Sequence, residues 1–279
     1  MEQPLTIVDA NHADKGYWKE VWRYRGLFFY LAWRDVLVRY KQTAVGIAWS
    51  VLRPLLYIGA FLLFGLIFGK EDGAIPNALI IAVGVLPWQL FATAFAESAG
   101  SVVGNANLLT KVYFPRIIVP ASTLIVALID FAIALGVLVV LLIVFGYVPS
   151  GNLIFFPLFM IFGLITAAGS GFLIAALNVK FRDFRYVVPF IVQIGMFVSP
   201  VGFDSNAIYG SSSIPDFAKT LYALNPMVGV IDGFRWCVLG DNITMHWDML
   251  MISGGFSIFL LIIGIWYFRR VESTFADII

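Results

Sequence analysis

The chain has 279 residues, of which 61% are hydrophobic and only 13% are charged, and its mean hydropathy is +0.91. Soluble domains are about half apolar, so this composition excludes a soluble protein and predicts a single membrane domain. The net charge of +1 gives no reason to expect a nucleic-acid partner, because the basic residues are spread between apolar segments.

Few residues are available for metal or disulfide chemistry. Cys237 is the only cysteine, which excludes an intrachain disulfide and a cysteine-based metal cluster. His12 and His246 are too few and too far apart in the sequence for a metal site, so we expect no metal. The first 26 residues lack the apolar core of a secretory signal. We therefore expect a cytoplasmic tail at 1–23 and a membrane domain at 24–279.

The first helical pattern is FFYLAWRDVLVRYKQ at 28–42. Its apolar positions recur at helical spacing, while charged and amide side chains fill most of the opposite side. The apolar stripe contains Phe29, Trp33, Val36, Leu37 and Tyr40, and the polar side contains Arg34, Asp35, Arg39, Lys41 and Gln42. This pattern predicts an amphipathic interfacial helix, which either anchors the chain at the membrane surface or docks a partner.

Six apolar segments approach the length of about 20 residues that spanning requires. They lie at about 49–69, 78–98, 117–145, 153–177, 187–203 and 249–268. The long uncharged run from 131 to 179 must contain two spans, because GYVPSGN at 146–152 has the composition of a turn. An even number of spans places both termini on the same side.

Aromatic residues recur at helical spacing along the first two spans. Tyr57, Phe61, Phe64 and Phe68 lie on the first span, and Trp88, Phe91 and Phe95 lie on the second. Such stripes ordinarily face lipid or a neighbouring helix.

The distribution of lysine and arginine predicts the orientation, because cytoplasmic loops carry an excess of both. With the N-terminus inside, fifteen of the 18 basic residues fall in inner segments, and only Lys70, Lys219 and Arg235 fall outside. The fifteen are Lys15, Lys19, Arg23, Arg25, Arg34, Arg39, Lys41, Arg53, Lys111, Arg116, Lys180, Arg182, Arg185, Arg269 and Arg270. We therefore expect both termini in the cytoplasm.

Two inner loops carry the remaining clusters of polar residues. The first, NANLLTKVYFPRIIVP at 105–120, contains Lys111, Tyr113 and Arg116, and the second, NVKFRDFRYVVP at 178–189, contains Lys180, Arg182, Asp183 and Arg185. Together with the interfacial helix, they predict a compact cytoplasmic surface. The chain contains no GxxxxGK[ST] motif, so any ATP-driven function requires a separate ATPase subunit.

The outer stretch 204–248 predicts two short helices. The first begins after Pro215 and runs to Leu224. Asn225 and Pro226 then interrupt the helical pattern, and the second helix ends at Gly240. Both are too short to span, so we expect re-entrant or interfacial helices.

Two acids lie in or near the membrane. Glu97 lies near the inner end of the second span, whereas Asp130 lies well inside the third, where a charge is costly. Asp130 supports an alternative function, a proton- or ion-coupled secondary transporter of a small solute. Against it, the sequence offers no second ionisable partner at matching depth and no visible inverted repeat. An integral-membrane transferase is a third class, but the outer acids show no catalytic spacing.

Four blocks of sequence carry a resemblance to a known family. They are WRDVLVRYKQTAVGIAWSVLRPL at 33–55, NANLLTKVYFPRIIVPAS at 105–122, NVKFRDFRYVVPFIVQIGMFVSPVGF at 178–203 and LNPMVGVIDGFRW at 224–236. In this order they resemble the permease subunit of ABC-type polysaccharide exporters, of the O-antigen and teichoic-acid kind. The resemblance implies an all-α integral membrane fold with six transmembrane helices, and a permease that exports lipid-linked polysaccharide across the bacterial inner membrane.

The resemblance also implies partners and sites. Two copies of the permease would pair with two ABC ATPase subunits, which bind ATP and Mg, so this chain itself would hold no cofactor. Segments 105–116 and 178–186 would be short coupling helices. The implied ATPase-coupling residues are Arg34, Asp35, Arg39, Lys111, Tyr113, Arg116, Lys180, Arg182, Asp183 and Arg185. The aromatic stripes would line a sugar conduit, and Leu224, Asn225, Pro226 and Arg235 would belong to an outer gate.

Overall fold

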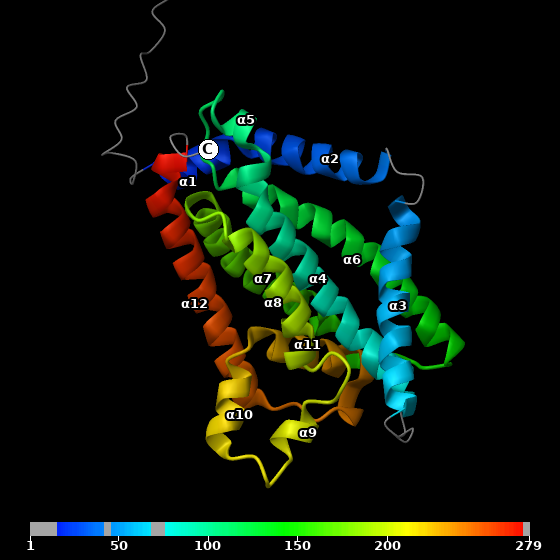
Figure 1. The fold of residues 1–279 in the computed structure, drawn as a ribbon. Coiled ribbons are helices and arrows are strands. Elements are labelled where there is room, and N and C mark those ends of the chain that lie inside the picture. Colours follow the sequence, from blue (N-terminus) through cyan, green and yellow to red (C-terminus); the bar gives the residue numbers. More distant parts are fainter. Residues whose placement is uncertain (1–15, 42–45, 68–75, 276–279) are drawn as a thin grey trace, which may run out of the picture.

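The computed structural model describes residues 16–41, 46–67 and 76–275, and every regular element in this part of the chain is a helix (Figure 1). The α-helices are α1 (Tyr17–Arg23), α2 (Arg25–Lys41), α3 (Gly46–Ile67), α4 (Asn77–Gly104), α5 (Ala106–Leu109), α6 (Ile118–Val144), α7 (Phe156–Lys180), α8 (Phe184–Val198), α9 (Asn206–Tyr209), α10 (Asp216–Ala223), α11 (Pro226–Leu239) and α12 (Trp247–Val271). Three short 3-10 helices complete the set, η1 (Gly151–Phe155), η2 (Gly240–Asn242) and η3 (Glu272–Thr274).

Five of these helices, α3, α4, α6, α7 and α12, are long and apolar enough to cross a membrane. They correspond to five of the six spans expected from the sequence. The segment expected at 187–203 forms α8, which has only 15 residues and ends at Val198. At 1.5 Å per residue α8 is about 22 Å long, shorter than the roughly 30 Å hydrocarbon core. It ends there because Pro200 disfavours a helical conformation at Ser199, whose backbone is extended.

The bundle is built around α4, which is buried along most of its length and contacts α3, α6, α7, α8 and α11. Small residues allow the helices to approach closely. A Cβ atom on Gly171 of α7 would lie 2.7 Å from Ser98 of α4, and one on Gly169 would lie 2.5 Å from the backbone nitrogen of Leu261 in α12. Close approach at small residues is typical of helix packing in membranes, so these positions fix how α7 crosses its neighbours.

The two ends of the bundle are different (Figure 1). The helices α1, α2 and α5, the C-terminal end of α12 and the connection from α7 to α8 gather at one end, and α9, α10 and α11 lie toward the other. The first end carries most of the basic residues that the sequence analysis assigned to the inner side. Lys219 and Arg235 belong to the second, whereas Lys15 and Lys70 lie outside the described residues.

The helix α2 corresponds to the predicted interfacial helix and packs on α6. Its buried residues are Leu31, Ala32 and Val36, whereas Phe29 and Trp33 are about two-thirds exposed, at 63% and 61%. Most of the predicted apolar stripe therefore faces away from the protein. This is the side on which aromatic rings can reach lipid headgroups.

Helices α10 and α11 agree with the two short helices expected in the outer stretch. The Asn225 side chain caps α11 by accepting a hydrogen bond from the backbone nitrogen of Met227 at 3.1 Å. Gly240 ends it with a φ of +67°, a conformation that glycine adopts without a steric penalty. Because α11 is buried from Met227 to Leu239 except for Trp236, it belongs to the packed core of the bundle.

Candidate functional site

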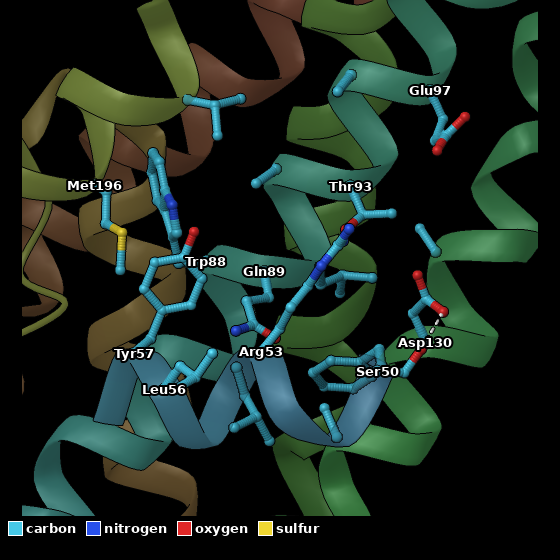
Figure 2. Close-up of a pocket in the computed structure, with 18 of the residues that line it drawn as sticks. Ser50, Arg53, Leu56, Tyr57, Trp88, Gln89, Thr93, Glu97, Asp130 and Met196 are labelled. Carbon is cyan, nitrogen blue, oxygen red and sulfur yellow. Dashed lines mark hydrogen bonds between the residues drawn. The ribbon is translucent and has the colours of Figure 1, made fainter. Parts of the chain in front are cut away.

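A cavity of about 810 Å³ lies between α2, α3, α4, α6 and α8 (Figure 2). Its volume falls within the range of small-molecule binding sites. The lining combines apolar, aromatic, polar and charged side chains: Arg39, Trp49, Ser50, Arg53, Leu56, Tyr57, Leu86, Trp88, Gln89, Leu90, Ala92, Thr93, Ala96, Glu97, Ala127, Asp130, Phe131, Ala134, Val192, Gln193, Ile194, Met196 and Phe197.

Two of the seven predicted conduit aromatics, Tyr57 and Trp88, line this cavity. Phe61 instead packs near Phe197, with ring centroids 6.5 Å apart, and Phe64 is 61% exposed. Phe68 lies outside the described residues.

The remaining aromatics of the second stripe are buried in the helix core. Phe91 and Phe95 stack with their ring centroids 5.5 Å apart and are 6% and 0% exposed, so they pack against neighbouring helices instead of lining the cavity. A period of 3.6 residues identifies one side of a helix, but it does not say whether a neighbouring helix covers that side.

Trp49, Phe131 and Phe197 complete the aromatic part of the wall, and the sequence analysis missed all three. A signal was present for one of them. Trp49, Arg53 and Tyr57 are spaced at i, i+4 and i+8, so the stripe on the first span extends one helical turn or more toward its N-terminus. For Phe131 and Phe197, only the tertiary packing of α6 and α8 brings them to the cavity.

An ion-pair network borders the cavity and joins α2 to the bundle. Arg39 of α2 lies 2.7 Å from the Asp130 carboxylate of α6 and 3.0 Å from Glu97 of α4. Tyr40 also donates a hydrogen bond to Asp130, and the Ser50 hydroxyl donates a second at 3.2 Å. Asp130 thus accepts bonds from α2 and α3.

The prediction that Asp130 has no ionisable partner is therefore wrong. The partner comes from a helix 91 positions earlier in the chain, at a distance that no periodicity can reveal. The negative charge of Asp130 is balanced, because one guanidinium and two hydroxyl donors surround its carboxylate.

Comparisons with known proteins identify the family. Residues 26–239 match the ABC-2 type transporter family. This chain belongs to the ABC-2 type transporter family. It is 28% identical over 262 residues to the O-antigen export system permease protein RfbA of Myxococcus xanthus, covering 93% of this chain and 97% of that protein. It is 29% identical over 249 residues to a protein of the same name from Klebsiella pneumoniae, covering 88% of this chain and 92% of that protein.

Six of the ten predicted coupling residues of this ABC-2 chain are exposed at the end where both described termini lie. They are Lys111, Tyr113, Lys180, Arg182, Asp183 and Arg185. In the first predicted coupling segment, only α5 is helical, over four residues. The second has no helix of its own and forms the turn Phe181–Asp183 between α7 and α8, because α7 extends to Lys180 and α8 begins at Phe184.

Three other predicted coupling residues bind within the chain, as Arg39 does. Arg34 donates to its neighbour Asp35 and, at 2.8 Å, to Asn105 at the end of α4. Arg116 donates to the backbone carbonyl of Glu272. These contacts attach α2 to the end of α4, and the first inner loop to the C-terminal end of α12.

A second contact to Glu272 involves the N-terminal helix α1. The Tyr17 hydroxyl donates to the Glu272 carboxylate at 2.9 Å, and Arg269 lies 4.4 Å from the centroid of the Tyr17 ring. Burial raises the pKa of Tyr17 far above its usual range, and the Glu272 carboxylate raises it further. Tyr17 therefore remains a hydrogen-bond donor, and it joins the N- and C-terminal parts of the ABC-2 chain.

The predicted outer-gate residues occupy different environments. Arg235 is completely buried, and its guanidinium donates to the carbonyls of Ile80 at 3.3 Å, Val201 at 3.0 Å and Phe203 at 2.8 Å. The Asn225 amide donates to the Ser199 hydroxyl at 2.9 Å. Leu224 and Pro226, by contrast, are partly exposed. Arg235 and Asn225 thus hold the segment after α8 against α4 and α11.

The part of the chain that the structure describes has no group of three or more histidine, cysteine or acidic residues arranged to hold a metal ion. The lone Cys237 is buried.

Proposed function

We propose that this chain is the permease subunit of an ATP-driven exporter that moves a lipid-linked, O-antigen-like polysaccharide across the bacterial inner membrane. One observation carries the proposal: the similarity to permeases named for O-antigen export extends over about nine-tenths of this chain and of those relatives. Its match to the ABC-2 family is consistent with a transport subunit. The ATPase is a separate chain, because this sequence has no nucleotide-binding motif.

In this proposal two copies of the permease form the conduit and pair with two ATPase subunits. The segment from α8 to Phe203 makes a sixth, shorter crossing, and both termini lie in the cytoplasm. The bias of lysine and arginine toward one end supports this orientation. Helices α10 and α11 lie on the outer side as an exit gate, which Arg235 and Asn225 hold in place.

The cavity contributes to the path of the glycan. Sugar rings present C–H faces that pack on aromatic rings without strict sequence requirements, which suits a polymer that must slide. Tyr57, Trp88 and Trp49 supply such rings, and Ser50 and Thr93 supply hydroxyl groups for sugar hydroxyls. The walls therefore offer both kinds of contact that a carbohydrate needs.

The proton-coupled alternative loses its main support. A coupling carboxylate must be free to exchange a proton with the transport path, whereas the Asp130 carboxylate is held by Arg39, Tyr40 and Ser50. We therefore propose a structural role for this acid.

The exposed turn between α7 and α8 is the proposed ATPase contact, and charge reversal tests it. We expect Arg182→Glu and Asp183→Arg to insert normally but to weaken ATPase association, because truncating one partner of a desolvated interfacial charge pair costs about 2 to 5 kcal/mol. Pull-down of the ATPase and surface glycan are the measurements. Arg23→Glu, on the exposed side of α1, is the matched charge reversal.

If the charge of this turn only sets the orientation of the chain in the membrane, both variants should associate with the ATPase normally. Isolated surface ion pairs contribute no more than about 1 kcal/mol, so a loop that only sets orientation would tolerate rearranged charge. Normal association and export in both variants would show that this turn is not part of the interface. The first inner loop and α2 would then be the remaining candidates for the ATPase contact.

Deletion of the gene tests the proposed function itself. We expect the deleted strain to lose surface polysaccharide and to retain the lipid-linked polymer at the inner face of the inner membrane. Wild-type protein expressed from a plasmid should restore display. Unchanged surface glycan in the deleted strain would contradict the proposal.

A further inference from the structure

Two polar side chains in the cavity have no role in the network around Asp130. Arg53 on α3 extends into the cavity toward α4 (Figure 2), and its guanidinium carbon lies 5.8 Å from the centre of the Trp49 ring. Gln89 on α4 also lines the cavity, and its Nε2 atom is buried without a hydrogen-bond acceptor among the described residues. Both side chains therefore bring donors into a largely apolar space.

The carboxylates of the cavity are already paired. Asp130 binds Arg39 and accepts bonds from Tyr40 and Ser50, and Glu97 binds Arg39. Within the described part of the chain, Arg53 forms no ion pair. Arg53 is exposed, so its guanidinium is accessible to an anionic partner that accepts its hydrogen bonds and balances its charge.

A phosphate group has the chemistry that these donors require. Guanidinium binds phosphate through two parallel hydrogen bonds, and the Gln89 amide can donate to another phosphate oxygen. The neighbouring Trp49, Tyr57 and Trp88 rings provide apolar surface beside this position. A molecule that joins a phosphate to an apolar chain or a sugar would contact both parts of the wall.

We propose that Arg53 and Gln89 bind the phosphate or diphosphate group of the lipid carrier to which the polysaccharide is linked. This inference rests on the proposed function, which supplies a lipid-linked substrate. Arg53 supplies the charge and the paired donors, and Gln89 supplies a third donor from the facing helix. An anionic phospholipid headgroup has the same phosphate chemistry, so the test must separate the two sources.

The test uses the purified full-length chain in nanodiscs of phosphatidylcholine. The probes are a polyprenyl diphosphate, the matching polyprenol without phosphate, and phosphatidylglycerol, and binding is measured by thermophoresis. We expect Arg53→Gln to weaken diphosphate binding at least ten-fold, which corresponds to about 1.4 kcal/mol, and to leave polyprenol binding unchanged. Arg53→Lys should bind with intermediate affinity, because lysine keeps the charge but not the two parallel donors.

A variant on the facing helix makes the test independent of any folding defect caused by Arg53. We expect Gln89→Leu to weaken diphosphate binding about three-fold or more, with polyprenol binding unchanged. Arg23→Gln, which removes an exposed arginine of α1, is the matched control and should bind all probes as the wild type does. An equal loss of polyprenol and diphosphate binding in both cavity variants would contradict a phosphate site.

Two further results would overturn the inference. Diphosphate binding within two-fold of wild type in both Arg53→Gln and Gln89→Leu would exclude these residues from the site. Phosphatidylglycerol binding as tight as that of the diphosphate, with the same dependence on Arg53, would assign the site to a membrane phospholipid. Surface glycan in the complemented deletion strain tests the proposed function separately, because that assay can succeed while the binding test fails.

Discussion

Replacing Arg235 with methionine is expected to abolish accumulation of the folded protein in the membrane. Methionine has similar length but no donors, so the carbonyls of Ile80, Val201 and Phe203 lose their guanidinium partner. The Ile80 carbonyl lies in α4 and keeps its helical hydrogen bond, whereas Val201 and Phe203 lie outside the helices. Each buried polar group left without a hydrogen bond costs about 1 to 3 kcal/mol, so a total loss of about 2 to 6 kcal/mol is expected. The measurements are the amount of protein in the membrane fraction and the thermal unfolding midpoint in detergent.

Two other variants distinguish the hydrogen bonds of Arg235 from its charge. Arg235→Lys should also destabilise the protein, since one ammonium group cannot reproduce the geometry of a planar guanidinium. Gly84→Ala should disturb the same contacts, because its Cβ would lie 2.6 Å from the Val201 carbonyl oxygen and 2.8 Å from Arg235 Nη2. Arg23→Met is the exposed control. Wild-type levels and an unchanged midpoint in Arg235→Met would contradict this account.

Replacing Asp130 with asparagine is expected to lower the free energy of unfolding by about 2 kcal/mol or more. Asparagine can still accept bonds from Tyr40 and Ser50, so the variant removes mainly the charge that faces Arg39. That pair is largely shielded, with side-chain exposures of 15% for Asp130 and 24% for Arg39. Breaking a shielded charge pair costs more than breaking an exposed one. Denaturant unfolding in micelles gives the measurement.

Glu97→Gln is the matched control, because Glu97 pairs with the same arginine but its side chain is 49% exposed. We expect it to cost less than about 1 kcal/mol. The double variant Arg39→Gln/Asp130→Asn should cost less than the sum of the two single variants, as contacting residues do. Additive costs, or equal effects of Asp130→Asn and Glu97→Gln, would show that the Arg39–Asp130 pair does not stabilise the fold more than an exposed ion pair does.

The helices were largely predictable from the sequence, whereas their contacts were not. Long apolar runs bounded by turn residues predict the long helices, although α4 continues to Gly104, beyond the predicted end at 98. Gly240 and Asn225 mark the limits of α11 through local backbone chemistry. Asp130 and Arg39, in contrast, meet because α2 crosses α6. Local periodicity contains no information about a contact between helices that are distant in the sequence.

Arg235 illustrates the same limit in a different way. The sequence places it in an outer segment, where a basic residue is ordinarily exposed, and the family resemblance implied a role in a gate. Its complete burial depends on carbonyls from two other segments, at the start of α4 and after α8. The connection between α7 and α8 differs, because Lys180, Arg182 and Asp183 lie in a short charged segment, and charged side chains in such a segment are ordinarily exposed, as these three are.

The most direct test of the proposed function is transport into inverted membrane vesicles that contain this chain and its ATPase. We expect lipid-linked polysaccharide to enter the vesicles only with ATP and an ATPase able to hydrolyse it, and a proton uncoupler to have no effect. Asp130→Asn protein that folds should show the same dependence on ATP. Transport that persists with a hydrolysis-deficient ATPase but stops with the uncoupler would contradict the account and favour a proton-coupled transporter.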